Sequence, residues 1–150
     1  MPVTGFDHIA LPTADAERFI AFYTGLGFGT LGEDEWRAGR RLLFSLTFGD
    51  NKINVHPPGL RAAMAGRPEY IVGLTAEPGC GDVCFVWAGG IDALVALLQE
   101  RDIPRVTGPV GRQGGRGNDD VGVSVYIRDP DGNLVEFISY DPDDIERYAS

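Results

Sequence analysis

The alternation of apolar and polar residues predicts a strand, a helix and then a hairpin in the first third of the chain. Residues 6–11 alternate as a short strand that ends before Pro12. Apolar residues then recur at helical spacing over 16–26, after Asp15 as a suitable N-cap. Residues 41–48 and 53–56 follow as two strands around a Gly-Asp-Asn turn, with a weaker strand expected over 28–31.

The same order of elements begins again at residue 82. Residues 82–86 read as a strand, and 91–98 carry apolar residues at helical spacing. Strands are predicted over 121–127 and 133–140, on either side of the turn sequence Asp-Pro-Asp-Gly at 129–132. A second module therefore repeats the pattern of the first.

Two copies of a long repeat predict paired modules, because a solenoid needs several short repeats. We therefore expect an α+β fold in which two βαβββ modules form a curved mixed sheet around a cleft. Module one is expected over about 4–57 and module two over about 81–141, with a linker rich in Pro and Gly over about 58–80. The 150 residues suit a single domain spanning 1–150.

Charge and composition narrow the classes of partner. The formal net charge is −9, from 13 Lys and Arg against 22 Asp and Glu, so phosphate backbones and anionic lipid surfaces are repelled. No apolar run approaches the roughly 20 residues that cross a bilayer, and the first residues do not resemble a signal peptide. We expect a cytoplasmic protein without nucleic acid or membrane partners, in which Cys80 and Cys84 are free thiols.

The candidate ligands of a metal fall on the first and last strands of the two modules. The only two histidines are His8, on the first strand of module one, and His56, on its last strand. Asp82 and Glu136 occupy the first and last strands of module two, at places taken to correspond to the histidines. Alternation sets these side chains on the face opposite the large apolar residues of each strand, where they can converge in a cleft.

Imidazole and carboxylate groups that converge in a partly apolar cleft suit a divalent metal, since unpaired buried charges are costly. A lone strand histidine is more often a satisfied polar residue, and a lone Glu136 can simply face water. The joint pattern favours His8, His56 and Glu136 as metal ligands. Asp82 is a fourth ligand, a loop cap or a general base.

Residues 111–120 contain four glycines and two arginines, and nothing apolar that would anchor them. The segment is either slack between two strands or a mobile lid. In the lid hypothesis it covers the metal cleft, and Arg112 or Arg116 approaches the charge of an anionic or chelating substrate.

Several motifs resemble the glyoxalase, bleomycin-resistance and extradiol-dioxygenase superfamily, also called the vicinal-oxygen-chelate superfamily. The residues are Phe-Asp-His-Ile-Ala-Leu at 6–11 with Arg-Phe-Ile-Ala-Phe-Tyr at 18–23, and Val-Tyr-Ile-Arg-Asp-Pro-Asp-Gly-Asn-Leu-Val-Glu at 125–136. Lys-Ile-Asn-Val-His-Pro at 52–57 resembles the branch around glyoxalase-domain-containing protein 5. The resemblance implies metal ligands at His8, His56 and Glu136, and many relatives have a ligand at the position of Asp82. Many glyoxalases carry Glu where this chain has His56 and His where it has Asp82.

The resemblance implies an enzyme that needs a divalent metal (Fe, Mn, Zn or Ni) and acts on a small substrate held through neighbouring oxygens. The reaction type would be that of a lyase, an isomerase or a ring-cleaving dioxygenase, with Glu136 and Asp82 as the catalytic candidates. Two alternatives are a thiol transferase of the fosfomycin-resistance type and a non-catalytic drug-binding protein of the bleomycin-resistance type. Small relatives usually dimerise, so a homodimer is expected.

Overall fold

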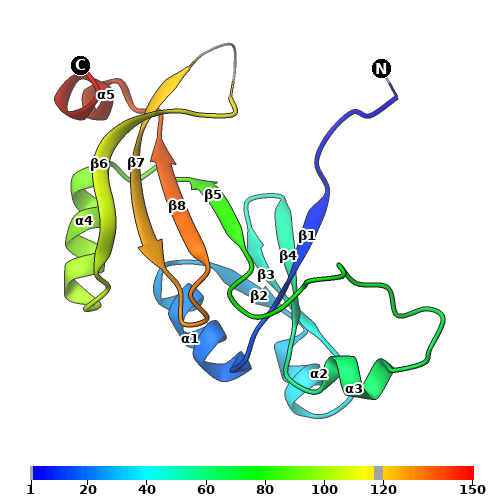
Figure 1. Cartoon of the computed structure of the whole chain (residues 1–150). Helices are drawn as coiled ribbons and strands as arrows, with labels where there is room; N and C mark the ends of the chain where they lie inside the picture. The colour runs from blue at the N-terminus through cyan, green and yellow to red at the C-terminus, as the bar shows by residue number, and fades with distance from the viewer. Residues whose placement is uncertain (1, 117–119) are drawn as a thin grey trace. The chain divides into compact units, whose positions relative to one another are not determined.

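The computed structural model describes residues 2–116 and 120–150, and the chain divides into two compact units, 1–80 and 81–150. Each unit carries one four-stranded sheet with both parallel and antiparallel neighbours (Figure 1). The two sheets confirm the predicted pair of βαβββ modules. Among the described residues, no helix is both long and apolar enough to cross a membrane.

The first unit has its sheet strands in the order β1-β4-β3-β2. Its elements are β1 (His8–Pro12), α1 (Ala16–Gly25), β2 (Gly29–Leu31), α2 (Glu33–Arg37), β3 (Phe44–Phe48), β4 (Asn51–His56) and α3 (Leu60–Met64). β1 runs parallel to β4, and the other neighbours are antiparallel. Both short helices, α2 and α3, were missed by the sequence pattern, because five residues are too few to show a helical period.

The second unit repeats this topology as β5-β8-β7-β6. Its elements are β5 (Asp82–Val86), α4 (Ile91–Glu100), β6 (Arg105–Gln113), β7 (Val121–Arg128), β8 (Leu134–Ser139) and α5 (Pro142–Tyr148). β5 runs parallel to β8, as β1 does to β4, and the β6–β7 and β7–β8 pairs are antiparallel. The matching order allows each strand of one unit to be aligned with its counterpart in the other.

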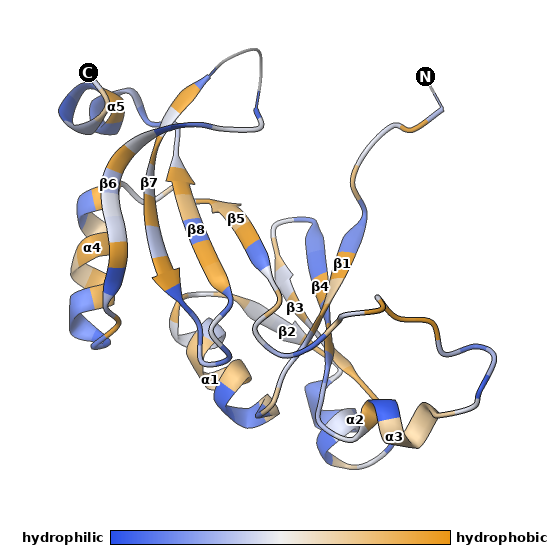
Figure 2. Ribbon diagram, in the orientation of Figure 1, coloured by the Kyte–Doolittle hydropathy of each residue, from blue (hydrophilic) through white to orange (hydrophobic). Residues whose placement is uncertain are grey.

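Alternation along the strands sets one apolar and one polar face on each sheet. Ile53 and Val55 on β4 are almost fully buried, whereas Asn54 between them is only partly covered. Val135 and Phe137 on β8 flank the half-buried Glu136 in the same way. Figure 2 shows the hydrophobic colour along β7 and β8 and the hydrophilic turn that joins them. The predicted alternation of β4 and β8 is therefore confirmed, and Glu136 lies on the face opposite Val135 and Phe137.

The predicted loop over 111–120 was placed too early. β6 continues to Gln113, and Arg112 pairs with Gly122 on β7. Two glycines on these strands allow neighbouring segments to pack closely, because they have no Cβ. A Cβ at Gly111 would lie 3.1 Å from Ala149 Cβ, and one at Gly122 would lie 2.7 Å from the Ser139 carbonyl oxygen. The part of this prediction that falls on residues 117–119 lies outside the described residues.

The C-terminal helix α5, also missed by the sequence pattern, is fastened by Asp144. This buried carboxylate accepts a hydrogen bond from the backbone N–H of Ile91, 3.1 Å away, and one from Ser139 Oγ at 2.6 Å. Asp144 therefore satisfies an N–H at the start of α4, which has no side-chain cap of its own. Helices α4 and α5 and strand β8 are joined at this one buried group.

Candidate functional site

Glu136 lies in the middle of the polar face of the second sheet. The register sets it between Cys84 on β5 and Tyr126 on β7. The fully buried Ser124 donates a hydrogen bond from its Oγ to Glu136 Oε1 at 2.5 Å. A half-buried carboxylate with one oxygen fixed in this way is held in a defined orientation, as metal-binding carboxylates are.

Asp82 lies on the same face, two residues before Cys84 on β5, and both side chains are exposed. Partial desolvation and the negative charges of Glu136 and Asp82 raise the pKa of the Cys84 thiol from 9.0 to about 12. Desolvation and a hydrogen bond to Glu136 also raise the pKa of Tyr126, although Arg112 opposes this. The face therefore concentrates negative charge, and it favours a cation or a proton.

We predict that Cys84 reacts slowly with iodoacetamide at pH 8.5 although it is exposed. At this pH a pKa of about 12 leaves roughly one thiol in 3,000 as thiolate, which is nearly a thousandfold below a thiol with the ordinary pKa of 9.0. Replacing Glu136 by Gln removes one of the negative charges and should speed up the reaction. Mass spectrometry of the alkylated peptides measures the rate, with Cys80 as the internal reference. An unchanged rate in Glu136→Gln would contradict the contribution of the Glu136 charge to the raised pKa.

Arg112 brings a positive charge to the polar face of the second sheet. Its guanidinium carbon lies 5.7 Å from the centre of the Tyr126 ring, within the range of a cation–π contact. Tyr126 in turn is the neighbour of Glu136 across β7 and β8. Arg112 thus belongs to β6 and reaches this face from a strand, whereas the sequence had assigned it to a loop.

His8 begins β1 on the polar face of the first sheet and is exposed. Its Nδ1 is hydrogen-bonded to the carboxylate of Asp7, and this bond lowers the pKa of Asp7. A carboxylate that holds one imidazole nitrogen fixes the ring and directs the other nitrogen outward, as in many metal-binding histidines. Asp7 is a partner of His8 that sequence reasoning missed, although it is the neighbouring residue.

The structure does not bring His8 and His56 together. In the parallel pair of β1 and β4, His8 lies opposite Lys52, and His56 lies opposite Pro12. The backbone positions of the two histidines are thus four residues apart in register, or about 13 Å along the strand direction. Two nitrogens that bind one metal lie within about 4 Å of each other.

The correspondence between His56 and Glu136 is corrected by the register. Glu136 lies opposite Cys84, two residues after Asp82, and in the first unit the residue opposite Ala10, two after His8, is Asn54. Asn54 therefore holds the place of Glu136, and His56 holds that of Ile138. Asn54 is half-buried, and its Oδ1 lies 3.0 Å from Ser45 Oγ, which donates to it. The sequence signal for Asn54 was its position two residues before His56, on the same face of the strand.

Within residues 2–116 and 120–150, no three His, Cys, Asp or Glu side chains gather at a spacing that could hold a metal ion. Two individual side chains nevertheless have groups that can bind a metal ion. Glu136 is a carboxylate oriented by Ser124, and His8 is an imidazole oriented by Asp7. Carboxylate and imidazole are ligands that Fe, Mn, Zn and Ni accept.

Comparison with known proteins relates nearly all of the chain to one family, although no family model matches it. The chain is 36% identical over 140 residues to glyoxalase domain-containing protein RDO1 of Mycosarcoma maydis, covering 93% of this chain and 70% of that protein. It is 34% identical over 142 residues to virulence protein STM3117 of Salmonella typhimurium, covering 93% of this chain and 87% of that protein.

Solved structures agree with the sequence comparison. The crystal structure of virulence protein STM3117 matches with a TM-score of 0.76 at 33% identity, over 94% of this chain and 100% of that one. Lactoylglutathione lyase from Agrobacterium tumefaciens shares the fold, with a TM-score of 0.64 at 24% identity, over 93% of this chain and 96% of that one. The chain therefore belongs to the glyoxalase family, within the vicinal-oxygen-chelate superfamily.

Proposed function

We propose that this protein is a divalent-metal-dependent enzyme that acts on a small substrate held through two neighbouring oxygens. The observation that carries the proposal is Glu136, a half-buried carboxylate oriented by Ser124 on the polar face of a family-typical sheet. A carboxylate fixed in this way and surrounded by groups with raised pKa is suited to bind a cation. The native metal is proposed to be Fe, Mn, Zn or Ni.

The proposed metal ligands are Glu136 and His8, and Asp82 is proposed as a further ligand or as the general base. When bound, the metal would supply Lewis-acid stabilisation of negative charge on a substrate oxygen. The carboxylate of Asp82 is exposed and can accept a proton from a substrate carbon. Arg112, beside Tyr126, is proposed to attract a substrate anion. Membership of His56 in the same ligand set stays a prediction, which the register of β1 and β4 disfavours.

Metal analysis of single-histidine variants tests the ligand set. We expect freshly purified protein to carry close to one metal per chain and His8→Ala to lose most of it. His56→Ala should keep the metal if the two histidines act separately, as their four-residue offset in register suggests. Loss in both variants, with the fold intact by circular dichroism, would restore the triad His8, His56 and Glu136. Full metal content in His8→Ala would remove His8 from the site.

Activity is tested by exchange of substrate protons with solvent deuterium, followed by proton NMR. The panel consists of small 2-hydroxyketones, 2-oxoaldehydes and catechols, each offered to the metal-loaded and the chelator-treated protein. Metal-dependent exchange or turnover of at least one compound supports an enzyme. Binding without any chemical change across the panel would favour the ligand-binding alternative. The homodimer and the cytoplasmic location stay predictions.

A further inference from the structure

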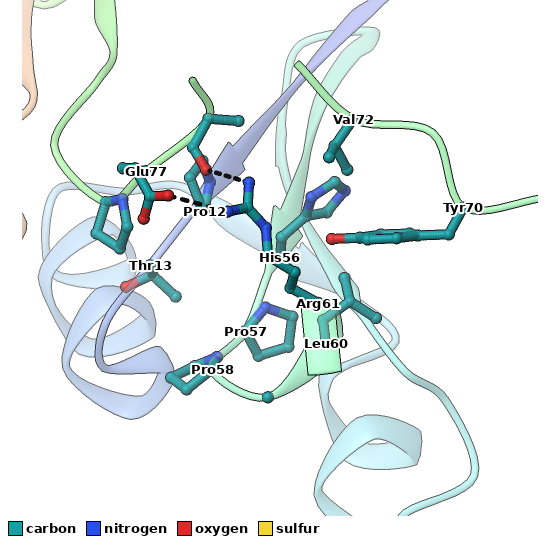
Figure 3. Close-up of a pocket in the computed structure, with 13 residues that line it drawn as sticks. Pro12, Thr13, His56, Pro57, Pro58, Leu60, Arg61, Tyr70, Val72 and Glu77 are labelled. Atoms are coloured by element: carbon teal, nitrogen blue, oxygen red, sulfur yellow. Dashed lines mark hydrogen bonds and ion pairs between the residues drawn. The ribbon is translucent and has the colours of Figure 1, made fainter. Parts of the chain in front are cut away.

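A pocket of about 150 Å³ lies in the first unit where β1 and β4 end side by side. The pairing of Pro12 with His56 and the hydrogen bond from Thr13 N to the His56 carbonyl, 3.0 Å, hold these two strand ends together. Helix α3 and residues 70–78 supply the remaining wall (Figure 3). The segment expected to be a mere linker therefore encloses a space beside His56.

The walls of the pocket are mostly apolar. They are formed by the rings of Pro12, Pro57, Pro58 and Pro78 together with Leu60 and Val72. Leu60 is buried and Val72 half-buried, so these side chains are held in place. Such a lining, with few polar groups, is typical of sites for small organic molecules.

Two polar groups face this space without a protein partner. Figure 3 shows the ring of His56 and the hydroxyl end of Tyr70 turned towards the same side of the pocket. In the part of the chain that the structure describes, neither side chain makes a hydrogen bond. His56 is half-buried, which lowers the pKa of its imidazole, and the neutral ring offers one acceptor and one donor nitrogen.

The charged groups of the pocket neutralise each other. Arg61 donates from Nη1 to Glu77 Oε1 at 2.9 Å and from Nη2 to the carbonyl oxygen of Ala76 at 3.3 Å. The ionisable side chains that line the pocket are those of Arg61, Glu77, His56 and Tyr70. Because Arg61 and Glu77 are paired with each other, they add no net charge to the lining, which favours an uncharged ligand.

We propose that this pocket binds a neutral monocyclic phenol through His56 and Tyr70. A cavity of about 150 Å³ accommodates one benzene-sized ring, and the proline rings and Tyr70 offer apolar contacts for it. The ligand hydroxyl donates to the free nitrogen of His56 and accepts from the Tyr70 hydroxyl. The inference does not rest on the proposed metal chemistry, because it uses the metal-free imidazole.

The test is a titration of the full chain with phenol, followed by NMR of the histidine ring protons in EDTA at pH 7.5. The chain has only two histidines, so His8 serves as the internal reference. We expect a saturable shift of the His56 resonance with a Kd of about 1 mM, and no shift of His8. Tyr70→Phe should weaken binding about 5- to 10-fold, since one hydrogen bond is lost.

Control variants and ligands separate the proposal from its rivals. Tyr148→Phe removes a phenol hydroxyl from α5 and should leave the affinity for phenol unchanged. Benzene makes neither hydrogen bond, so it should bind about 25- to 100-fold more weakly than phenol, and benzoate should not bind. Tighter binding of benzoate, a shift of His8 in place of His56, or equal affinity in Tyr70→Phe would each overturn the proposal. The double variant His56→Leu, Tyr70→Phe lacks both hydrogen-bond partners, so it should bind phenol and benzene alike, as measured on the proton signals of the ligands.

Discussion

Glu136→Gln is expected to remove most of the bound metal and to lower any metal-dependent turnover by at least about 100-fold. Gln has nearly the same volume as Glu and retains an oxygen that can accept the hydrogen bond from Ser124 Oγ. The variant therefore removes the negative charge and leaves the packing of β7 and β8 in place. Metal content by elemental analysis and turnover by proton NMR are the two measurements.

Two further variants make the Glu136 experiment specific. Glu146→Gln, on the exposed side of α5, makes the same chemical change away from the site and should behave as the unaltered protein. Ser124→Ala leaves the carboxylate but removes the hydroxyl that orients it, so we expect a loss of metal affinity of about 10-fold. A Glu136→Gln protein that retains stoichiometric metal would show that the metal is bound elsewhere.

Asp129→Ala is expected to lower the free energy of unfolding by about 3 kcal/mol. Asp129 is 5% exposed and lies in the turn between β7 and β8. Its carboxylate accepts hydrogen bonds from the backbone N–H groups of Asp131 and Asn133, at 3.0 and 2.9 Å, and from Asn133 Nδ2 at 2.8 Å. Alanine would leave these donors without a partner, two of them in a buried environment.

The loss of stability on replacing Asp129 should extend through Asn133 to the parallel pair of β5 and β8. The fully buried Asn133 accepts a hydrogen bond at its Oδ1 from the backbone N–H of Gly81, 2.7 Å away, directly before β5. Urea denaturation measures the change, and Asp50→Ala, in the exposed turn between β3 and β4, is the matched control with an expected change below about 0.5 kcal/mol. A loss below about 1 kcal/mol in Asp129→Ala would mean that water replaces the carboxylate.

The sequence pattern was most successful where a strand is half-buried and a turn has strong local chemistry. The alternation around Ile53 and Val55 predicted the buried face of β4, and the Asp-Pro-Asp-Gly turn predicted the β7–β8 hairpin. The helix cap at Asp15 was also recognised, and its side chain accepts from the Arg18 N–H at 3.0 Å. These features depend on residues that are close in sequence, so local propensity is sufficient to predict them.

The predictions that failed depended on neighbours distant in sequence. Residues 111–120 were expected to form a loop, either slack or a lid, but Gly111 is a strand residue of β6 whose missing Cβ permits close approach to Ala149. Helix α5 was missed, although the buried Asp144 fastens it to the start of α4. Neither contact leaves a periodic signal in the sequence.

The sequence by itself determined that two similar modules exist, which residues face the core, and which donor types the polar faces carry. Only the tertiary structure decided where along the strands those donors lie. Side chains alternate with a period of two, so a shift of two residues keeps the face and moves a side chain by about 7 Å. Alternation was therefore compatible with His56 as the counterpart of Glu136, whereas the hydrogen-bonded register selects Asn54 and leaves His56 beside a pocket of its own.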